Sequence, residues 1–238
     1  MSECIVLAGG FGSRLQQVVK DVPKCLAEVA GKPFLAYLFD YLAKQAVSRV
    51  ILSLGYKSEA VINWIDKNSF PFETDYVVES TPLGTGGGIK LAMSKALEKT
   101  VFVINGDTFF EVNLQAMQEA HRKKKADISI ALKPMRDFDR YGSVKLDADN
   151  RITDFIEKKH CALGLINGGV YLIERQLLNN MRLGEKFSFE KDVLENKSSG
   201  IHLFGCIDDG YFIDIGIPSD FEQANRDFKH RQANEHGK

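Results

Sequence analysis

The stretch CIVLAGGFGSRL, residues 4–15, joins a short apolar run to a turn that holds three glycines and an arginine. Because glycine has no Cβ, the backbone N–H groups around Gly9, Gly10 and Gly12 can approach a polyphosphate closely. The guanidinium of Arg14 carries two donors that can bind phosphate oxygens together. The stretch therefore predicts a strand followed by a phosphate-binding loop.

Two common glycine-rich motifs do not fit this turn. A P-loop needs serine or threonine after its Gly-Lys pair, whereas Gly31-Lys32 is followed by Pro33. The dinucleotide fingerprint GxGxxG fails because Leu15 stands in place of its third glycine. A second cation follows at Lys24, and an arginine and a lysine beside a glycine turn fit a triphosphate better than a dinucleotide. For the glycines alone, a strand-to-helix turn without a ligand remains the alternative.

Strand-like and helix-like runs alternate along residues 1–135. The strand-like runs are Cys4–Ala8, Arg49–Leu54, Glu73–Val78, Val101–Asn105 and Asp127–Lys133. The runs with helical spacing are Phe34–Ala46, Ser58–Lys67, Gly88–Leu97 and Leu114–Lys125. This rhythm predicts βαβ units and an α/β fold, a Rossmann-like three-layer α/β/α arrangement with a mostly parallel mixed sheet. Ligands of such sheets bind beyond the carboxyl ends of the strands, where the glycine turn is expected.

The pattern changes in the second half of the chain. Strand-like runs separated by short turns cover Ser143–Leu146, Ile152–Glu157 and Leu165–Ile173, and helical spacing covers Gln176–Met181 and Phe189–Asn196. They predict a small antiparallel elaboration of the sheet, suited to substrate binding. A last strand, Tyr211–Ile215, leads into a helix that begins near Pro218. The polar tail from Lys229 is expected to fray.

Composition excludes several classes of function. Of the 238 residues, 44% are hydrophobic and 26% are charged, which is typical of a globular protein with a substantial core. The net charge of −1 gives no electrostatic reason to expect nucleic acid or an anionic membrane. No apolar stretch reaches the roughly 18 residues of a membrane span, and no secretory signal precedes the glycine turn. The four cysteines form no CxxC pair and the five histidines show no metal-ligand spacing, so we expect a cytoplasmic protein.

A series of motifs resembles the signature of the sugar-1-phosphate nucleotidyltransferases, or NDP-sugar pyrophosphorylases. In order, the motifs are LAGGFGSRL…VPKCLAEVAGKP (7–33), STPLGTGGG (80–88), INGD (104–107), EK (157–158), NGGVY (167–171) and FIDIGIPSDF (212–221). They fall in the order found in the family and cover nearly the whole chain. The chain length, GTGGG and IDIGIPSDF are most similar to the branch that transfers GMP to D-glycero-D-manno-heptose 1-phosphate.

This resemblance implies a direct transfer reaction. An oxygen of a sugar 1-phosphate attacks the α-phosphorus of an NTP and pyrophosphate leaves, without a covalent enzyme intermediate. Such a reaction depends on positioning two anions and neutralising charge. The family's catalytic residues match Arg14, Lys24, Asp107, Lys158 and Asp214 here. Arg14 and Lys24 match the family residues that bind the NTP phosphates. Lys158 matches the family residue that holds the sugar phosphate.

Asp107 and Asp214 are the expected metal ligands. Each follows or ends an apolar, strand-like run, so each carboxylate is expected near a strand end. Hard carboxylate oxygens suit Mg²⁺ that is shared with substrate phosphates. The matching aspartates of the family hold this ion, so the resemblance implies Mg²⁺ as cofactor. For any single aspartate at a strand end, a turn or helix cap is the alternative.

The resemblance also implies two sets of substrate-binding residues. The nucleotide set is Leu7, Ala8, Gly9, Gly10, Gly12, Arg14, Lys24, Glu79, Pro82, Gly84, Thr85 and Asp107. The sugar-phosphate set is Gly142, Glu157, Lys158 and Asn167. The chain is then one nucleotidyltransferase domain: residues 1–135 mainly bind the NTP, residues 136–210 mainly bind the sugar phosphate, and residues 211–238 carry the second metal aspartate and a C-terminal helix.

The position of Glu79 indicates the base. This carboxylate precedes Gly84 by five residues, in a region that faces the base in the family. Guanine offers N1–H and N2–H₂ side by side, which one carboxylate can accept together, whereas uracil and thymine offer one N–H between two carbonyls. GTP is therefore the expected donor. UTP stays open because a related uridylyl-transferring branch carries a TGGG stretch, and the backbone near Ala8 could read the base while Glu79 points to solvent.

Alternatives also remain for the acceptor and for the class of protein. A heptose 1-phosphate is the expected acceptor, with mannose 1-phosphate and amino-sugar phosphates as alternatives. A catalytically silent nucleotide-sugar-binding regulator could share this fold, and an NAD-dependent oxidoreductase or an interaction module are further classes. The presence of Lys24 and both aspartates favours catalysis. We expect no separate allosteric domain, and a monomer or a small homo-oligomer.

Overall fold

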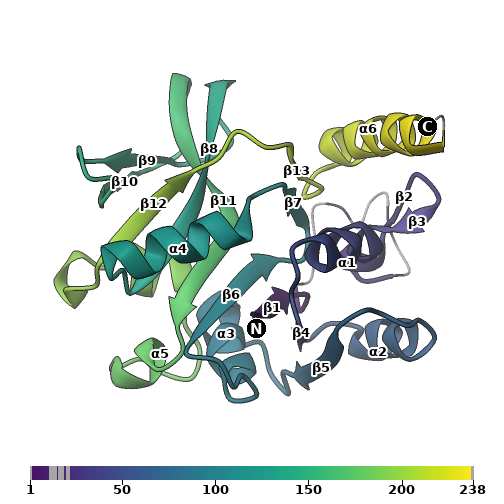
Figure 1. The fold of residues 1–238 in the computed structure, drawn as a ribbon, viewed down its shortest axis with the longest axis horizontal. Coiled ribbons are helices and arrows are strands. Elements are labelled where there is room, and N and C mark those ends of the chain that lie inside the picture. The colour runs from purple at the N-terminus through teal and green to yellow at the C-terminus, as the bar shows by residue number, and fades with distance from the viewer. Residues whose placement is uncertain (1, 11–14, 16–18, 20–21, 237–238) are drawn as a thin grey trace.

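The structure, a computed structural model, describes residues 2–10, 15, 19 and 22–236 (Figure 1). In this part of the chain the largest sheet has nine strands, and seven of them lie in the order β10-β9-β11-β6-β1-β4-β5. Four strands form a parallel half, β1 (Glu3–Leu7), β4 (Arg49–Leu54), β5 (Glu73–Val78) and β6 (Thr100–Asn105). The helices between them are α1 (Phe34–Lys44), α2 (Ser58–Asp66) and α3 (Gly84–Met93), which confirms the predicted βαβ units.

The second half of the sheet is mostly antiparallel, as predicted. Helix α4 (Leu114–Lys124) leads into β8 (Ile128–Phe138), and β9 (Ser143–Leu146), β10 (Ile152–Ile156) and β11 (Cys161–Glu174) follow. Strand β11 pairs antiparallel with β6, β8 and β9, so it joins the two halves. In Figure 1 the far ends of β8 and β11 project beyond the other strands. Both strands are longer than predicted because they support each other as a two-stranded ribbon past the core.

The two faces of the sheet are both buried, which confirms the three-layer fold. In β1, Cys4 and Val6 belong to one core cluster, together with residues of α1, α2, α4 and α6 (Pro218–His236). The intervening Ile5 belongs to the other cluster, together with α3, α5 (Leu177–Asn180) and the short π-helix η2 (Phe189–Leu194). This alternation follows from the two-residue period of a strand. No helix among the described residues combines the length and apolar character that crossing a membrane requires.

Several short elements were not predicted. They are β2 (Glu28–Val29), β3 (Lys32–Pro33), β7 (Thr108–Phe110), β12 (Leu203–Ile207), and the 3₁₀ turns η1 (Lys24–Leu26) and η3 (Lys197–Ser199). Strand β13 (Phe212–Asp214) confirms the predicted strand Tyr211–Ile215 and is shorter than predicted. Runs of two or three residues leave no periodic signal in a sequence. Strand β12 pairs parallel with β8 and contains Gly205, where a Cβ would lie 2.7 Å from Leu132. A side chain at Gly205 would therefore force the leucines packed on it to shift.

The expectation that the tail frays from Lys229 is wrong. Helix α6 continues to His236. Arg231 Nη1 donates to Glu111 Oε1 at 2.7 Å, and Gln232 Nε2 donates to the hydroxyl of Tyr37 at 2.7 Å. These contacts with distant parts of the chain hold a helix whose exposed sequence is polar.

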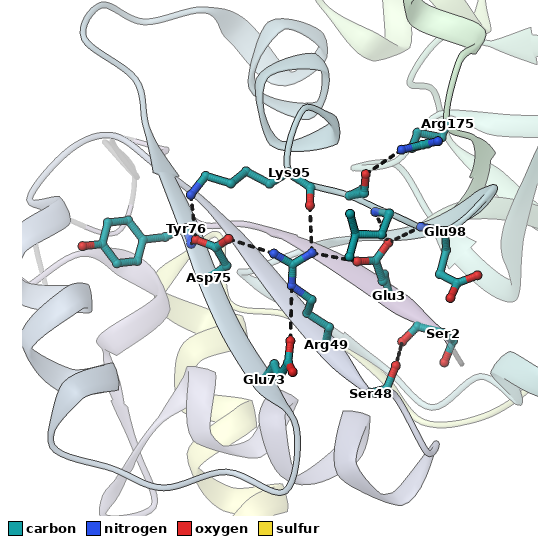
Figure 2. Close-up of polar contacts among 12 residues, drawn as sticks. Ser2, Glu3, Ser48, Arg49, Glu73, Asp75, Tyr76, Lys95, Glu98 and Arg175 are labelled. Carbon is teal, nitrogen blue, oxygen red and sulfur yellow. Dashed lines mark hydrogen bonds and ion pairs between the residues drawn. The ribbon is translucent and has the colours of Figure 1, made fainter.

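An arginine at the amino-terminal edge of the parallel strands connects three of them (Figure 2). Arg49 lies 3.0 Å from Glu3 of β1 and 2.9 Å from Asp75 of β5, and it donates to the carbonyl of Lys95 at 2.8 Å. Glu3 Oε2 accepts backbone N–H bonds from residues 97 and 98, each at 2.6 Å. Because the Arg49 side chain is 17% exposed, solvent screens these pairs weakly. The network ties this end of the sheet to the segment after α3.

We predict that Arg49→Ala lowers the free energy of unfolding by about 2–3 kcal/mol, because it leaves the nearly buried Glu3 carboxylate without its cation. Denaturant unfolding followed by circular dichroism measures this change. Glu73→Gln is the matched control, since that carboxylate lies 3.8 Å from Arg49 and is 81% exposed, and it should change stability little. Equal stability of Arg49→Ala and the wild type would contradict the role of the network.

Candidate active site

A cavity of about 360 Å³ opens beyond the carboxyl ends of β1, β4, β5 and β6. Ten residues of the predicted nucleotide set line it, namely Leu7, Ala8, Gly9, Gly10, Lys24, Glu79, Pro82, Gly84, Thr85 and Asp107. Parallel strands bring these residues together because their carboxyl ends share one edge of the sheet. The structure therefore gathers residues that are up to a hundred positions apart around one site.

The glycine turn approaches the neighbouring strand closely. A Cβ at Gly55 would lie 2.9 Å from the carbonyl oxygen of Gly9, so the two backbones meet without room for a side chain there. A Cβ at Gly10 would meet nothing within 4 Å, which leaves its backbone accessible from the cavity. Gly12 and Arg14 lie outside the described residues, and their predicted roles stay predictions.

A lysine lies between the two predicted metal aspartates. Lys24 Nζ is 2.5 Å from Asp107 Oδ2 and 3.7 Å from Asp214 Oδ1. Asp107 stands between β6 and β7, and Asp214 ends β13, which pairs antiparallel with β7. The backbone N–H of Ile215 donates to the Asp107 carbonyl at 3.0 Å. This small ladder is what brings two distant aspartates to one point.

The charges of this group favour a further cation. Burial raises the pKa of Asp214, and the nearby Asp107 carboxylate raises it further, whereas Lys24 lowers it. Asp107, Asp214 and Lys24 together carry a net negative charge, and Arg140, which also lowers the pKa of Asp214, is paired with Asp220 at 2.6 Å. Among the described residues, no group of three or more His, Cys, Asp or Glu side chains forms a ready-made metal site. Two carboxylates therefore fit an ion such as Mg²⁺ that takes its other ligands from water and substrate phosphates.

Glu79 lines the cavity and does not point away into solvent. Its Oε2 accepts the backbone N–H of Leu83 at 2.9 Å, which orients the carboxylate. Its Oε1 lies 2.8 Å from the position that a Cβ would occupy at Gly88, so the glycine makes room for it. Each carboxylate oxygen can accept more than one hydrogen bond. Glu79 is thus placed as an acceptor at the wall of the site.

The glycine-rich segment before α3 differs from the prediction. Helix α3 begins at Gly84, whereas the sequence predicted a start at Gly88. Gly86 N donates to the Phe187 carbonyl at 3.1 Å, and a Cβ at Gly86 would overlap the Phe187 ring. Glycine disfavours helix in isolation. Here the first turn forms because the segment around Phe187 packs directly on its backbone.

Thr85 lines the cavity, but its hydroxyl is engaged within the protein. Thr85 Oγ1 donates to Glu190 Oε2 at 2.7 Å and accepts the backbone N–H of Phe189 at 2.9 Å. These bonds link α3 to η2, and the predicted nucleotide contact of Thr85 stays a prediction.

The sugar-phosphate set lies together on the antiparallel part of the sheet, around Ser143 of β9. A Cβ at Gly142 would lie 2.8 Å from the carbonyl oxygen of Ile156 in β10, directly before Glu157 and Lys158, which are both exposed. Asn167 follows Ile166 of β11, which pairs with Ser143 of β9, so it lies beside Gly142, and its Nδ2 donates to the Tyr171 hydroxyl at 2.9 Å. None of the four lines the cavity described above. Their assignment to the sugar phosphate remains a prediction.

Six lining residues were not predicted, namely Cys25, Ser53, Gly88, Asn105, Gly106 and Glu190. The INGD motif already contained Asn105 and Gly106, so their position could have been inferred. Glu190 gave no signal, because tertiary contacts bring it to α3. Burial and the Asp107 charge raise the pKa of the Cys25 thiol to about 12, so this cysteine is protonated and not a nucleophile.

We predict that Gly86→Ala destabilises the protein by about 1–3 kcal/mol, because the added methyl forces the Phe187 ring out of its place. Hydrogen exchange should show faster opening of residues 185–190 as the segment loosens. Gly184→Ala is the matched control, since its Cβ would meet no atom closer than 4.0 Å. Equal exchange in both variants would contradict the packing role of the glycine.

The chain resembles known proteins along almost its whole length. The family model described as nucleotidyl transferase matches residues 3–231. The D-glycero-alpha-D-manno-heptose 1-phosphate guanylyltransferase of Aneurinibacillus thermoaerophilus is 46% identical over 228 residues, which cover 96% of this chain and 99% of the relative. The enzyme of the same name from Campylobacter jejuni is 42% identical over 219 residues, or 92% and 96% of the two chains. The crystal structure of HddC from Yersinia pseudotuberculosis complexed with GMP-PN matches with a TM-score of 0.87 and 37% identity, covering 96% and 100% of the chains.

Proposed function

The chain belongs to the nucleotidyl transferase family, and we propose that it transfers GMP from GTP to D-glycero-α-D-manno-heptose 1-phosphate. The observation that carries this proposal is the convergence of ten predicted nucleotide-binding residues on one cavity, with Lys24 between Asp107 and Asp214. Relatives that are 46% and 42% identical are heptose 1-phosphate guanylyltransferases, which supports both the donor and the acceptor. The retained lysine and aspartates favour an enzyme over a silent nucleotide-sugar sensor.

In this reaction a phosphate oxygen of the sugar 1-phosphate attacks the α-phosphorus of GTP in line. The bond from the α-phosphorus to the bridging oxygen breaks, and pyrophosphate leaves with the electron pair. Lys24 is placed to neutralise charge on the phosphates, and the backbone around Gly9 and Gly10 can donate to them. Arg14 is proposed to assist in the same way. No protein nucleophile takes part, in keeping with the protonated Cys25.

Asp107 and Asp214 would hold Mg²⁺ in this enzyme. When bound, the ion would polarise the α-phosphate and offset its negative charge. The two aspartates are hard oxygen donors that the β7–β13 ladder holds near each other, and their residual negative charge suits a divalent cation. We propose that Lys158 binds the phosphate of the acceptor, since it adjoins Gly142 and Glu157 on the antiparallel part of the sheet.

We predict that Asp107→Asn and Asp214→Asn each lower kcat by about 100-fold or more, because a neutral amide is a weak Mg²⁺ ligand. Initial rates over a range of Mg²⁺ concentrations measure the loss, and the apparent affinity for the ion should fall in the same variants. Asp209→Asn, an exposed aspartate that pairs with Lys133, is the matched control and should behave as wild type. Near-normal turnover of both variants would remove the metal assignment.

Glu79 is proposed to accept N1–H and N2–H₂ of guanine. We predict that Glu79→Gln lowers the preference for GTP over UTP by about tenfold or more, because one bidentate pair discriminates by about 1–3 kcal/mol. The ratio of kcat/KM for the two nucleotides measures this preference. An unchanged ratio would assign base recognition to the backbone near Ala8 and Gly84.

Pyrophosphate release tests the proposed function as a whole. The wild-type chain is assayed with Mg²⁺ and four NTPs, each combined with the 1-phosphates of D-glycero-α-D-manno-heptose, mannose, glucose and N-acetylglucosamine. Release with GTP and the heptose phosphate is the expected result. Release with UTP and N-acetylglucosamine 1-phosphate would agree with the proposed mechanism but contradict the assignment of GTP as donor and the heptose phosphate as acceptor. No release with any pair, despite nucleotide binding, would support the silent sensor.

We further propose that the enzyme acts in the cytoplasm, as a monomer or a small homo-oligomer. The four cysteines are free, which suits a reducing compartment, and the substrate GTP is made there.

A further inference from the structure

We propose that the carboxylate of Glu190 accepts hydrogen bonds from ring hydroxyls of the sugar 1-phosphate and so helps to select the acceptor. This inference rests on the function proposed above and extends it to a residue outside the recognised motifs. Glu190 lines the cavity that also contains Lys24 and Asp107. It belongs to the π-helix η2, within residues 136–210, which the sequence assigned mainly to the sugar phosphate without naming Glu190.

The protein holds this carboxylate through one of its two oxygens. Glu190 Oε2 accepts from Thr85 Oγ1 at 2.7 Å and from Ser188 Oγ at 3.0 Å. Thr85 Oγ1 is itself fixed by the backbone N–H of Phe189. Among the described residues, no hydrogen bond to Oε1 and no ion pair of Glu190 is present, so the side chain is oriented but its charge is not neutralised. Thr85 acts here as a positioning residue.

The negative charge restricts which part of a substrate can lie beside Glu190. A carboxylate without a cation repels phosphate, so it does not fit the phosphate end of the cavity. It fits groups that donate, which in these substrates are the base N–H groups and the sugar hydroxyls. Glu79 already stands at the wall that we assign to the base. Hydroxyls are thus the donors that remain for Glu190.

Neighbouring contacts favour the hydroxyls of the acceptor. Phe189 packs edge-to-face on Tyr171, with ring centroids 5.1 Å apart, and the Tyr171 hydroxyl accepts from Asn167. Burial raises the pKa of Tyr171, and the charges of Glu190 and Asp107 both add to this rise. Glu190 thus follows Phe189, which contacts Asn167's partner Tyr171, and it lines one cavity with Asp107. Asn167 is the residue that the sequence assigned to the sugar.

The test compares wild type with Glu190→Gln in the presence of GTP and D-glycero-α-D-manno-heptose 1-phosphate. We expect KM for the sugar phosphate to rise about tenfold or more, because charge-assisted hydrogen bonds are lost, while KM for GTP changes by less than about twofold. A monodeoxy sugar phosphate that lacks the bound hydroxyl should bind wild type more weakly, with no further loss in Glu190→Gln. Glu195→Gln, an exposed carboxylate at the end of the same helix, is the matched control.

Variants of Thr85 test whether its hydroxyl positions the Glu190 carboxylate. They also test the inference if Glu190→Gln does not fold. Thr85→Val removes the hydroxyl at similar volume and should raise KM for the sugar phosphate, whereas Thr85→Ser should restore it. If Thr85→Val acted only by loosening α3, Thr85→Ser would not return KM for the sugar phosphate to the wild-type value while KM for GTP stayed unchanged.

Other outcomes overturn the inference. A rise in KM for GTP that disappears with 2′-deoxy- or 3′-deoxy-GTP would assign Glu190 to the ribose. Unchanged constants for both substrates in folded Glu190→Gln would make the carboxylate structural. Calorimetric titration with the sugar phosphate gives Kd without turnover. A wild type without guanylyl transfer would therefore contradict the proposed function, while the Kd values of wild type and Glu190→Gln would still decide this inference.

Discussion

The ammonium group of Lys24 between the carboxylates of Asp107 and Asp214 is the interaction on which the rest of the site depends. Without a cation, two carboxylates would not lie this close in a partly buried place. The β7–β13 ladder holds the aspartates, and the short turn η1 holds the lysine. Three segments, from the two ends and the middle of the chain, therefore bring their charged side chains together at this point.

Close backbone packing shapes the wall of the cavity opposite these charges. The glycines of α3 allow the segment around Phe187 to lie directly on the helix, and this contact delivers Glu190 to the cavity. Glu79 reaches the wall past Gly88 for the same reason. In a nucleotide-binding loop, glycines are commonly explained by access for phosphate. Here most of the GTGGG run serves contacts within the protein, and the accessible backbone lies at Gly10.

The two edges of the parallel strands use charge in opposite ways. At the amino-terminal edge, Arg49 pairs with the nearly buried Glu3 and the partly exposed Asp75. At the carboxyl edge, Asp107 and Asp214 carry more negative charge than Lys24 balances, since the nearby Arg140 pairs with Asp220. A saturated network stabilises, whereas an unsaturated one retains affinity for ions and donors. The amino-terminal ends of the parallel strands thus contribute to stability, and their carboxyl ends form the candidate site.

The sequence by itself determined the α/β class, the bounds of the parallel strands to within a residue, and the motifs that line the cavity. These features are local: burial on both faces makes strands apolar, and residues that follow parallel strands share one edge. The tertiary structure alone decided that α3 begins at Gly84, that α6 is ordered beyond Lys229, and that Glu190 enters the site. Each of these depends on a contact between segments distant in the chain, where packing outweighs the weak intrinsic preferences of glycine and of polar residues. Such contacts leave no period or spacing in the sequence from which they could be read.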